Sequence, residues 1–150
     1  MPQSLSQILV HLVFSTHLRR RTLIPEIRER VFPYMAGILA NHGCPALSIG
    51  GTEDHVHVLF SLSRTVTIAD TVKNIKKSSS DFINQQIRPA GKFSWQGGYG
   101  AFSIRSSDSE VVRHYIKTQE DHHKQVSFQD EFRKICAEFD VELDERYVWE

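Results

Sequence analysis

The sequence predicts an α+β fold in which an antiparallel sheet follows the order strand, helix, strand, strand, helix, strand, with further helices after it. Three observations support this prediction. Apolar residues alternate in some segments, recur at helical spacing in others, and are separated by proline, glycine and capping residues. The length of 150 residues suits a single domain, 1–150, with its own core.

The net charge limits which partners the protein can attract, and the cysteine content indicates the redox state of its compartment. Eighteen basic and eighteen acidic side chains give a formal net charge of zero, so a nucleic-acid contact must come from local clustering. Cys44 and Cys136 make neither a disulfide framework nor a cysteine zinc site, which predicts a reducing cytoplasm. We expect no signal peptide, no membrane span and no membrane partner.

The first half of the chain predicts a strand, a helix and a hairpin. Residues 8–15 are apolar on both faces, as is typical of an interior strand. Pro25 begins a helix that ends at Gly43, and Pro33 within it predicts a kink or a break. The elements that follow are a strand over 46–49, a turn over 50–54 and a strand over 55–62.

The second half predicts further helices around a fourth strand. Thr67 caps a helix, and a glycine-rich stretch then leads into the strand. Ser107 and Glu110 match a capping box, which predicts a third helix running to about His122, and a fourth helix begins near Phe128. The first six elements match the split βαβ pattern of a ferredoxin-like sheet, with the first two helices on one face.

His55 and His57 belong to the predicted third strand. Side chains two residues apart leave the same face of a strand, so these histidines point the same way and can share one metal ion. Val56 and Val58 then point into the core on the other face. Taken alone, the pattern favours surface histidines on a half-exposed strand, and a metal site needs a second group of residues.

Tyr115 and Gln119 are the candidates for that second group. They are four residues apart and project from one face of the predicted third helix, the natural cover for the histidine face. His55, His57 and the Gln119 carbonyl oxygen could hold a divalent metal that polarises a phosphodiester oxygen, and Tyr115 could attack the phosphorus. The alternative is a packed helix aromatic beside a surface amide.

Longer stretches around these residues resemble a known family. The stretches are, in order, 11–16 with the arginines after them, 51–59, 95–103 and 115–124. They resemble the single-tyrosine HUH (His, hydrophobic residue, His) transposases of bacterial and archaeal insertion sequences, including the relatives of REP-associated tyrosine transposases. The resemblance implies a ferredoxin-like fold, related in layout to RNA-recognition-type sheets, with additional C-terminal helices, one of which carries the catalytic tyrosine.

The resemblance also implies an activity and a set of roles. His55 and His57 match the metal histidines, Tyr115 the nucleophile and Gln119 the third ligand, with Mg²⁺ or Mn²⁺ as the ion. Such enzymes recognise hairpins at element ends in single-stranded DNA, cut through a 5′-phosphotyrosine and leave a free 3′-OH. They work as homodimers, in which the tyrosine helix of one chain can complete the metal site of the other.

For several other residues, the sequence allows both a functional and a purely structural role. Adjacent helix residues diverge by about 100°, so His122 and His123 are interpreted as helix-end polarity rather than as a metal pair. Asp54 either orients one of the strand histidines or shapes the turn. The candidate DNA contacts, each of which taken singly is more typical of a solvated surface, are Arg19, Arg20, Arg21, Lys73, Lys76, Lys77 and Arg105.

Two other classes of function stay open. One is a different phosphoesterase that uses His-x-His, although Leu59 stands where histidine-triad hydrolases need a third histidine. The other is a catalytically inactive or domesticated protein that binds single-stranded DNA hairpins.

Overall fold

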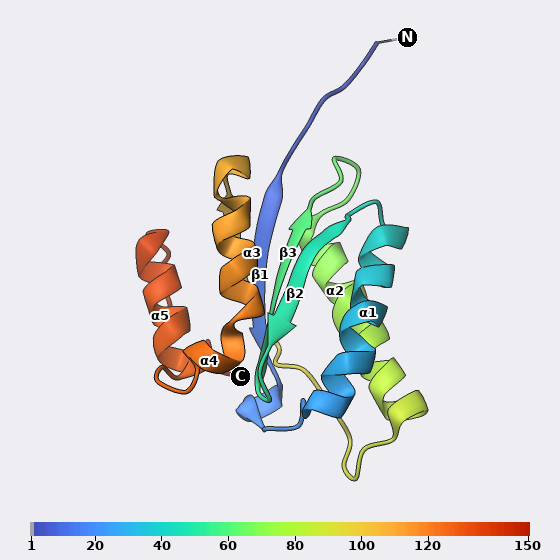
Figure 1. Ribbon diagram of the computed structural model, residues 1–150, viewed down its shortest axis with the longest axis vertical. Coiled ribbons are helices and arrows are strands. Elements are labelled where there is room, and N and C mark those ends of the chain that lie inside the picture. Colours follow the sequence, from blue (N-terminus) through green and yellow to red (C-terminus); the bar gives the residue numbers. More distant parts are fainter. Residues whose placement is uncertain (1) are drawn as a thin grey trace.

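The computed structural model describes residues 2–150, which form one four-stranded sheet with helices on both faces (Figure 1). The strands are β1 (Leu9–Ser15), β2 (Ala46–Gly51), β3 (His55–Ser61) and β4 (Gly100–Ile104). The helices are α1 (Pro25–Asn41), α2 (Ile68–Phe82), α3 (Ser109–Lys117), α4 (Gln119–His122) and α5 (Phe128–Glu138). Short helical turns are η1 (His17–Arg19), η2 (Ile83–Ile87) and η3 (Ser106–Asp108).

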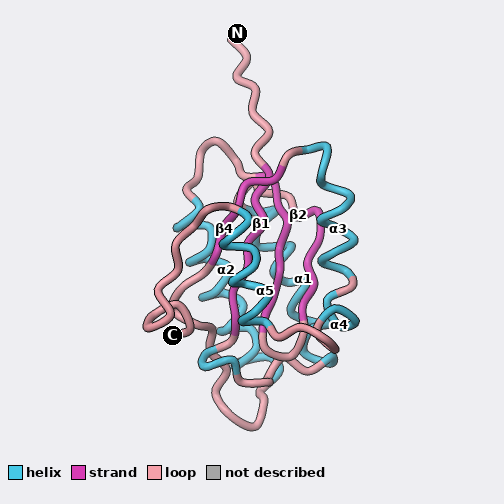
Figure 2. Tube along the Cα trace, turned by 90° about the vertical axis from the view of Figure 1, so that its left-hand side faces the viewer, coloured by secondary structure: helices cyan, strands magenta, loops and turns pink. Residues whose placement is uncertain are grey.

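The strand order is β2-β3-β1-β4, and every neighbouring pair is antiparallel. β1 and β3 are therefore the interior strands, as their apolar sequences require. Helices α1 and α2 cover one face, and α3, α4 and α5 lie on the other (Figures 1 and 2). The predicted ferredoxin-like α+β fold with additional C-terminal helices is confirmed.

The main core lies between the sheet and the layer of α1 and α2. Alternate residues of β3, Val56, Val58 and Phe60, point into it, as predicted. They meet apolar side chains such as Met35 of α1 and Ile75 of α2. Burial of each such side chain contributes about 1.5–3 kcal/mol, so this layer supplies much of the stability of the fold.

On the opposite face, two glycines let helices approach the sheet closely. A Cβ at Gly50 of β2 would lie 2.3 Å from the carbonyl oxygen of Ile116 in α3. A Cβ at Gly100 of β4 would lie 2.7 Å from the ring of Phe132 in α5. Accordingly α3 lies beside β2, and α5 lies in front of β1 and β4 (Figure 2).

Two local predictions are wrong, and a third is wrong in part. Helix α1 runs through Pro33, which lies at an exposed position, so the break that was one of the two predicted outcomes does not occur. The capping box does not form, since no side chain caps the N-terminus of α3. The predicted third helix is interrupted at Thr118, so that Tyr115 lies on α3 and Gln119 begins α4.

Other boundaries differ by a few residues. β2 continues through Gly50 and Gly51, which shortens the predicted turn. The glycine-rich stretch from Trp95 becomes regular strand only at Gly100, although Trp95 makes an isolated bridge to Thr16. The predicted cap of α2 is confirmed, because Thr67 Oγ1 accepts a hydrogen bond from the Asp70 amide.

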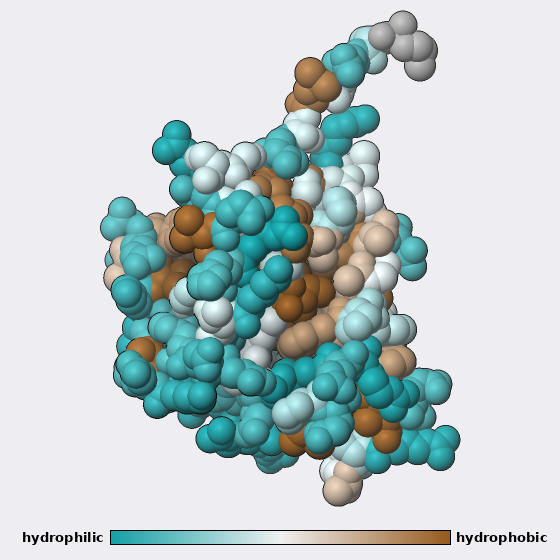
Figure 3. All heavy atoms as spheres, in the orientation of Figure 1, coloured by the Kyte–Doolittle hydropathy of each residue, from teal (hydrophilic) through white to brown (hydrophobic). Residues whose placement is uncertain are grey.

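The surface of the face drawn in Figure 1 is mostly hydrophilic over α3, α4 and α5. Hydrophobic side chains gather in the middle of this face, over the edge strand β2 (Figure 3). Within residues 2–150, no helix combines the length and the apolar character needed to cross a bilayer.

Candidate metal centre and nucleophile

His55 and His57 lie on the sheet face opposite the main core. Both residues are 0% exposed, because α3, α4 and α5 cover this face. The alternative interpretation as surface histidines on a half-exposed strand is therefore wrong. Their ring centroids are 5.2 Å apart, so the two imidazoles share one small volume.

Each of these rings has one nitrogen held by a neighbouring side chain. His55 Nδ1 lies 2.7 Å from Asp54 Oδ1, and Thr52 Oγ1 donates to the same carboxylate oxygen. His57 Nδ1 lies 2.8 Å from Nε2 of His11, a buried residue of β1. Asp54 therefore orients His55 and not His57. Partners of this kind fix the orientation of metal-binding imidazoles and leave Nε2 as the ligand atom.

The contact between Gln119 and His55 fits a shared cation. Gln119 Nε2 donates to the carbonyl oxygen of Tyr115, which directs Gln119 Oε1 to within 3.0 Å of His55 Nε2. Burial acts to raise the pKa of Asp54, but the hydrogen bond with His55 outweighs burial and lowers it. The ionised carboxylate then accepts a hydrogen bond from the Nδ1–H of His55. His55 Nε2 then presents a lone pair to an amide oxygen, an arrangement that needs a proton or a metal ion between the two acceptors.

Tyr115 reaches the histidines through Glu131 of α5. The Tyr115 hydroxyl donates a hydrogen bond to Glu131 Oε2, and Glu131 Oε1 lies 2.8 Å from His57 Nε2. The rings of Tyr115 and His57 meet edge to face with centroids 5.6 Å apart. The tyrosine of α3 is thus held beside the histidine pair of its own chain.

Four possible metal ligands converge at this point. One ligand atom each from His55, His57, His123 and Glu131 lies within 4.8 Å of all the others. His123 Nε2 is 3.1 Å from Glu131 Oε1 and yet is a buried nitrogen without a hydrogen-bond partner. Because buried polar atoms are nearly always paired, a nitrogen of this kind beside a carboxylate and two imidazoles is typical of a metal ligand. The residues of this site fit a divalent metal ion.

The Glu131 carboxylate dominates the electrostatics of the site. Burial acts to raise the pKa of Glu131, but contacts with His123 and His57 outweigh it and hold that pKa well below its ordinary value. Burial lowers the pKa of His57 to about 4 against the pull of Glu131. Burial and repulsion from His57 lower the pKa of His11 to about 3. Burial and the charge of Glu131 raise the pKa of Tyr115. At neutral pH, Glu131 is ionised, Tyr115 is protonated, and His11 and His57 are neutral.

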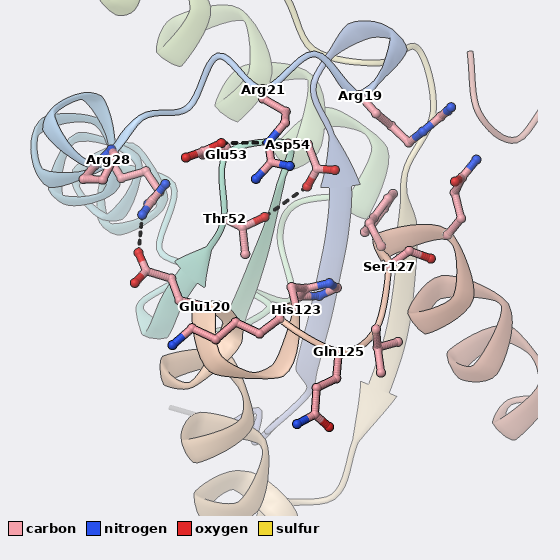
Figure 4. Close-up of a pocket in the computed structure, with 15 residues that line it drawn as sticks. Arg19, Arg21, Arg28, Thr52, Glu53, Asp54, Glu120, His123, Gln125 and Ser127 are labelled. Atoms are coloured by element: carbon pink, nitrogen blue, oxygen red, sulfur yellow. Dashed lines mark hydrogen bonds and ion pairs between the residues drawn. The ribbon is translucent and has the colours of Figure 1, made fainter.

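A cleft of about 720 Å³ opens beside the cluster, with His123 among its lining residues (Figure 4). The segment 124–129 lines it together with the turn 52–54 and the loop after β1. Arg19 and Arg21 reach it from that loop, and Arg21 is paired with Glu53 (Figure 4). Because His123 belongs to both the cleft and the cluster, the cleft leads toward the histidines. Its lining carries both basic and acidic side chains, and Arg19 is a basic residue there without an ion-pair partner among residues 2–150.

The other predicted DNA contacts lie away from this cleft. Lys73, Lys76 and Lys77 are on α2, in the layer that covers the opposite face of the sheet. The Lys76 amino group already makes hydrogen bonds within the chain, because Nζ donates to the carbonyl oxygens of Gln96 and Gly98. Arg20 and Arg105 are exposed and do not line the cleft. The structure brings Arg19 and Arg21 to the site and leaves the other candidates apart from it.

Sequence reasoning missed Glu131 and misjudged His123. The interpretation of His123 as helix-end polarity is wrong, since its side chain is only 9% exposed and belongs to the cluster. Glu131 occupies the buried stripe of α5 together with Phe128 and Phe132. An acidic residue in an otherwise apolar stripe is the signal that points to it, because a buried carboxylate needs a partner.

Comparisons with known proteins place this chain in a family. The family described as "Transposase IS200 like" matches residues 4–119. The ISDra2 transposase TnpA of Deinococcus radiodurans is 23% identical over 120 residues, which are 77% of this chain and 86% of that protein.

Two solved structures share the fold. A crystal structure ascribed to a transposase of Deinococcus radiodurans R1 matches with a TM-score of 0.60 at 21% identity, over 79% of this chain and 98% of that one. A REP-associated tyrosine transposase bound to a REP hairpin matches with a TM-score of 0.61 at 14% identity, over 84% of this chain and 76% of that one. With the family match covering most of its length, the chain belongs to the IS200-like transposases.

Proposed function

We propose that this transposase cuts and rejoins single-stranded DNA through a covalent 5′-phosphotyrosine at Tyr115. The observation that carries the proposal is the position of the Tyr115 hydroxyl, which shares the Glu131 carboxylate with His57 Nε2. A half-buried tyrosine hydroxyl paired with a buried carboxylate is unnecessary for packing, whereas a nucleophile must lie beside the group that activates the phosphate. This arrangement favours catalysis over the alternative of an inactive hairpin-binding protein.

We assign the divalent ion, Mg²⁺ or Mn²⁺, to His55, His57 and the amide oxygen of Gln119. The facing lone pairs of His55 Nε2 and Gln119 Oε1, 3.0 Å apart, support this assignment. When bound, the ion would polarise a non-bridging oxygen of the scissile phosphodiester as a Lewis acid.

In the cleavage step, the Tyr115 oxygen forms a bond to phosphorus while the bond from phosphorus to the 3′ oxygen breaks. The tyrosine proton, which already faces Glu131, is released, and the 3′ oxygen takes up a proton to leave as a free 3′-OH. The new phosphodiester conserves the energy of the old one. Attack by a 3′-OH on the phosphotyrosine is the reverse chemistry, so rejoining needs no external energy source.

The DNA strand would approach through the cleft beside His123. Arg19 and Arg21 at its rim are suited to phosphate oxygens, and their contacts would make binding sensitive to salt. The similar structure that holds a REP hairpin supports recognition of hairpins at the element ends. The two free, buried cysteines are consistent with a reaction in the cytoplasm.

We further propose that Tyr115 can serve the histidines of its own chain, within the homodimer that the resemblance implies. The intrachain path from Tyr115 through Glu131 to His57 supports action in cis. Mixing the Tyr115→Phe and His57→Ala variants tests this point. Action in cis leaves the mixture inactive, whereas completion of the site in trans restores activity.

The experiment that tests the function is adduct formation with a single-stranded oligonucleotide taken from DNA that flanks the gene. With Mn²⁺, the wild type is expected to form an adduct that survives denaturing electrophoresis, and Tyr115→Phe is expected to form none. The matched control is Tyr99→Phe, at an exposed tyrosine away from the cluster. An adduct that persists in Tyr115→Phe would show that the nucleophile is another residue.

A further inference from the structure

We propose that His123 and Glu131 are additional ligands of the metal ion and that they make the site prefer Mn²⁺, or another first-row transition ion, over Mg²⁺. The inference rests on the function proposed above and concerns what determines the metal preference of that same site. It adds two residues to the ligand set of His55, His57 and Gln119 and places them on the C-terminal part of the chain.

The distances between the Glu131 carboxylate and three imidazoles fit a shared metal ion. Glu131 Oε1 lies 2.8 Å from His57 Nε2, 3.1 Å from His123 Nε2 and 3.6 Å from His55 Nε2. Metal–ligand bonds of about 2.0–2.2 Å place ligand atoms about 3–4 Å from one another. These distances are close to that spacing, and all four ligand atoms lie within 4.8 Å of one another, so small side-chain shifts would let a single ion contact all four groups.

The Glu131 carboxylate is buried among imidazoles. This residue is 3% exposed, and a buried carboxylate costs several kcal/mol unless positive charge compensates it. Among residues 2–150 its ion-pair partners are all histidines, with no lysine or arginine. A divalent cation would compensate the carboxylate and would also give His123 Nε2 the partner that it otherwise lacks.

Packing holds both Glu131 and His123 in place. Phe128 and Phe132, on either side of Glu131 along the stripe of α5, pack against the sheet through Val13 and Phe102. The His123 ring lies against the ring of His55 with centroids 4.3 Å apart. Both residues lie beyond residue 119, the last residue of the family match.

The chemistry of the ligands predicts the choice of ion. Mg²⁺ prefers carboxylate, carbonyl and water oxygens and keeps most of its water, whereas imidazole suits transition-metal ions, and Mn²⁺ accepts both kinds of ligand. A set of three imidazoles with a carboxylate and an amide oxygen is therefore a poor site for Mg²⁺ and a good one for Mn²⁺. His123 and Glu131 are the residues that shift the balance.

The test is metal binding without DNA, measured by calorimetry with Mn²⁺ and with Mg²⁺ on wild type, Glu131→Gln, His123→Asn and His57→Asn. Wild type is expected to bind Mn²⁺ at least tenfold more tightly than Mg²⁺. Loss of outer partners of metal ligands typically costs about 10–100-fold in affinity, so loss of either proposed ligand should weaken Mn²⁺ binding at least tenfold. The matched controls, Glu138→Gln and His114→Asn, are at exposed positions and should leave the affinity unchanged.

A second measurement needs no variant at the site. Co²⁺ bound to the wild type should give contact shifts, which require a metal–ligand bond, on the imidazole protons of His55, His57 and His123 and none on those of His114. If only His55 and His57 carry contact shifts, or if Glu131→Gln binds Mn²⁺ as tightly as wild type or more tightly, the proposal is overturned. In that case Glu131 forms hydrogen bonds with the histidines but does not bind the metal ion. If His57→Asn also keeps full affinity, the metal site of the proposed function is itself misplaced.

Discussion

The two faces of the sheet differ in what their helices bury. Between the sheet and α1 and α2, the contacts are almost all apolar, as at Phe60. Between the sheet and α3, α4 and α5, apolar clusters at the margins surround a polar centre that contains His57 and Glu131. An apolar layer depends on filled volume, whereas a buried polar centre depends on each partner being in place. Substitutions on the first face should therefore change stability, and substitutions on the second should separate stability from activity.

The largest loss of stability is expected on the apolar face. Phe60→Ala removes a ring that is 0% exposed, and the cavity should cost about 3–5 kcal/mol in the free energy of unfolding. Urea denaturation followed by circular dichroism measures this change. A loss below about 1 kcal/mol would mean that the layer of α1 and α2 is not the main source of stability.

The next effect is a pH dependence that comes from the polar face. His57 and His11 have pKa values of about 4 and about 3 in the folded chain, below the ordinary value of 6.5. The unfolded chain therefore binds more protons than the folded one over this range. The stability contributed by these neutral rings is present above about pH 6.5 and is lost as the pH falls toward 4.

Two neighbours of these rings modify the curve. The raised pKa of His123 acts in the opposite sense and adds stability below pH 6.5 that is lost above it. The lowered pKa of Glu131 causes a further loss below about pH 4.5. Each ring contributes at most about 1.4 kcal/mol per pH unit, and we expect a net loss of about 3 kcal/mol between pH 6.5 and pH 4.5.

Urea denaturation at several pH values in the presence of a chelator measures this dependence. His11→Asn should make the curve distinctly shallower, and His114→Asn, at an exposed position, should not change it. A stability that stays level from pH 6.5 to pH 4.5 would contradict the neutral, buried histidines.

Gly50→Ala should reduce stability less than Phe60→Ala does, but it should reduce activity strongly. A Cβ at this position would lie 2.3 Å from the Ile116 carbonyl oxygen, so Gly50→Ala must push α3 and Tyr115 away from β2. We expect a loss of about 1–3 kcal/mol and a strong loss of adduct formation.

Gly37→Ala is the matched control for Gly50→Ala. It lies in α1 on the other layer, where an added Cβ meets nothing within 4 Å. It should gain about 0.5–1 kcal/mol and keep full activity. Equal adduct yields from Gly50→Ala and Gly37→Ala would show that the close approach of α3 is not needed for catalysis.

The smallest expected effect separates the basic residues of the two faces. Arg19→Gln, beside the cleft, should lower the affinity for single-stranded DNA and reduce the slope of log affinity against log salt by about one unit or less. Lys73→Gln, on α2, should change the slope less. Fluorescence anisotropy across a salt series measures both. A larger effect at Lys73 would place the DNA on the opposite layer.

The sequence predicted one half of this site better than the other, for a physical reason. The shared face of His55 and His57 follows from the two-residue period of a strand, which is a local property. Helical spacing predicts that Tyr115 and Gln119 lie together. The helix is interrupted at Thr118, yet the Gln119 side chain still reaches the Tyr115 carbonyl oxygen.

The contribution of the C-terminal segment could not be derived in the same way. His123 and Glu131 enter the cluster because the chain turns back after α4 and α5 packs against β1 and β4 through Phe132. These are contacts between segments far apart in sequence, and periodicity does not specify them. The full burial of the histidines depends on the same packing, which is why a half-exposed strand seemed the simpler interpretation.

The most direct test of the central claim is to identify the tyrosine that becomes linked to DNA. The chain has four tyrosines, and trypsin should release Tyr115 alone in the peptide His114–Lys117. After reaction of the wild type with the oligonucleotide and Mn²⁺, followed by nuclease and trypsin digestion, mass spectrometry should find the nucleotide on this peptide. A nucleotide on Tyr34, Tyr99 or Tyr147, or on no tyrosine at all, would contradict a site built from Tyr115, His55 and His57.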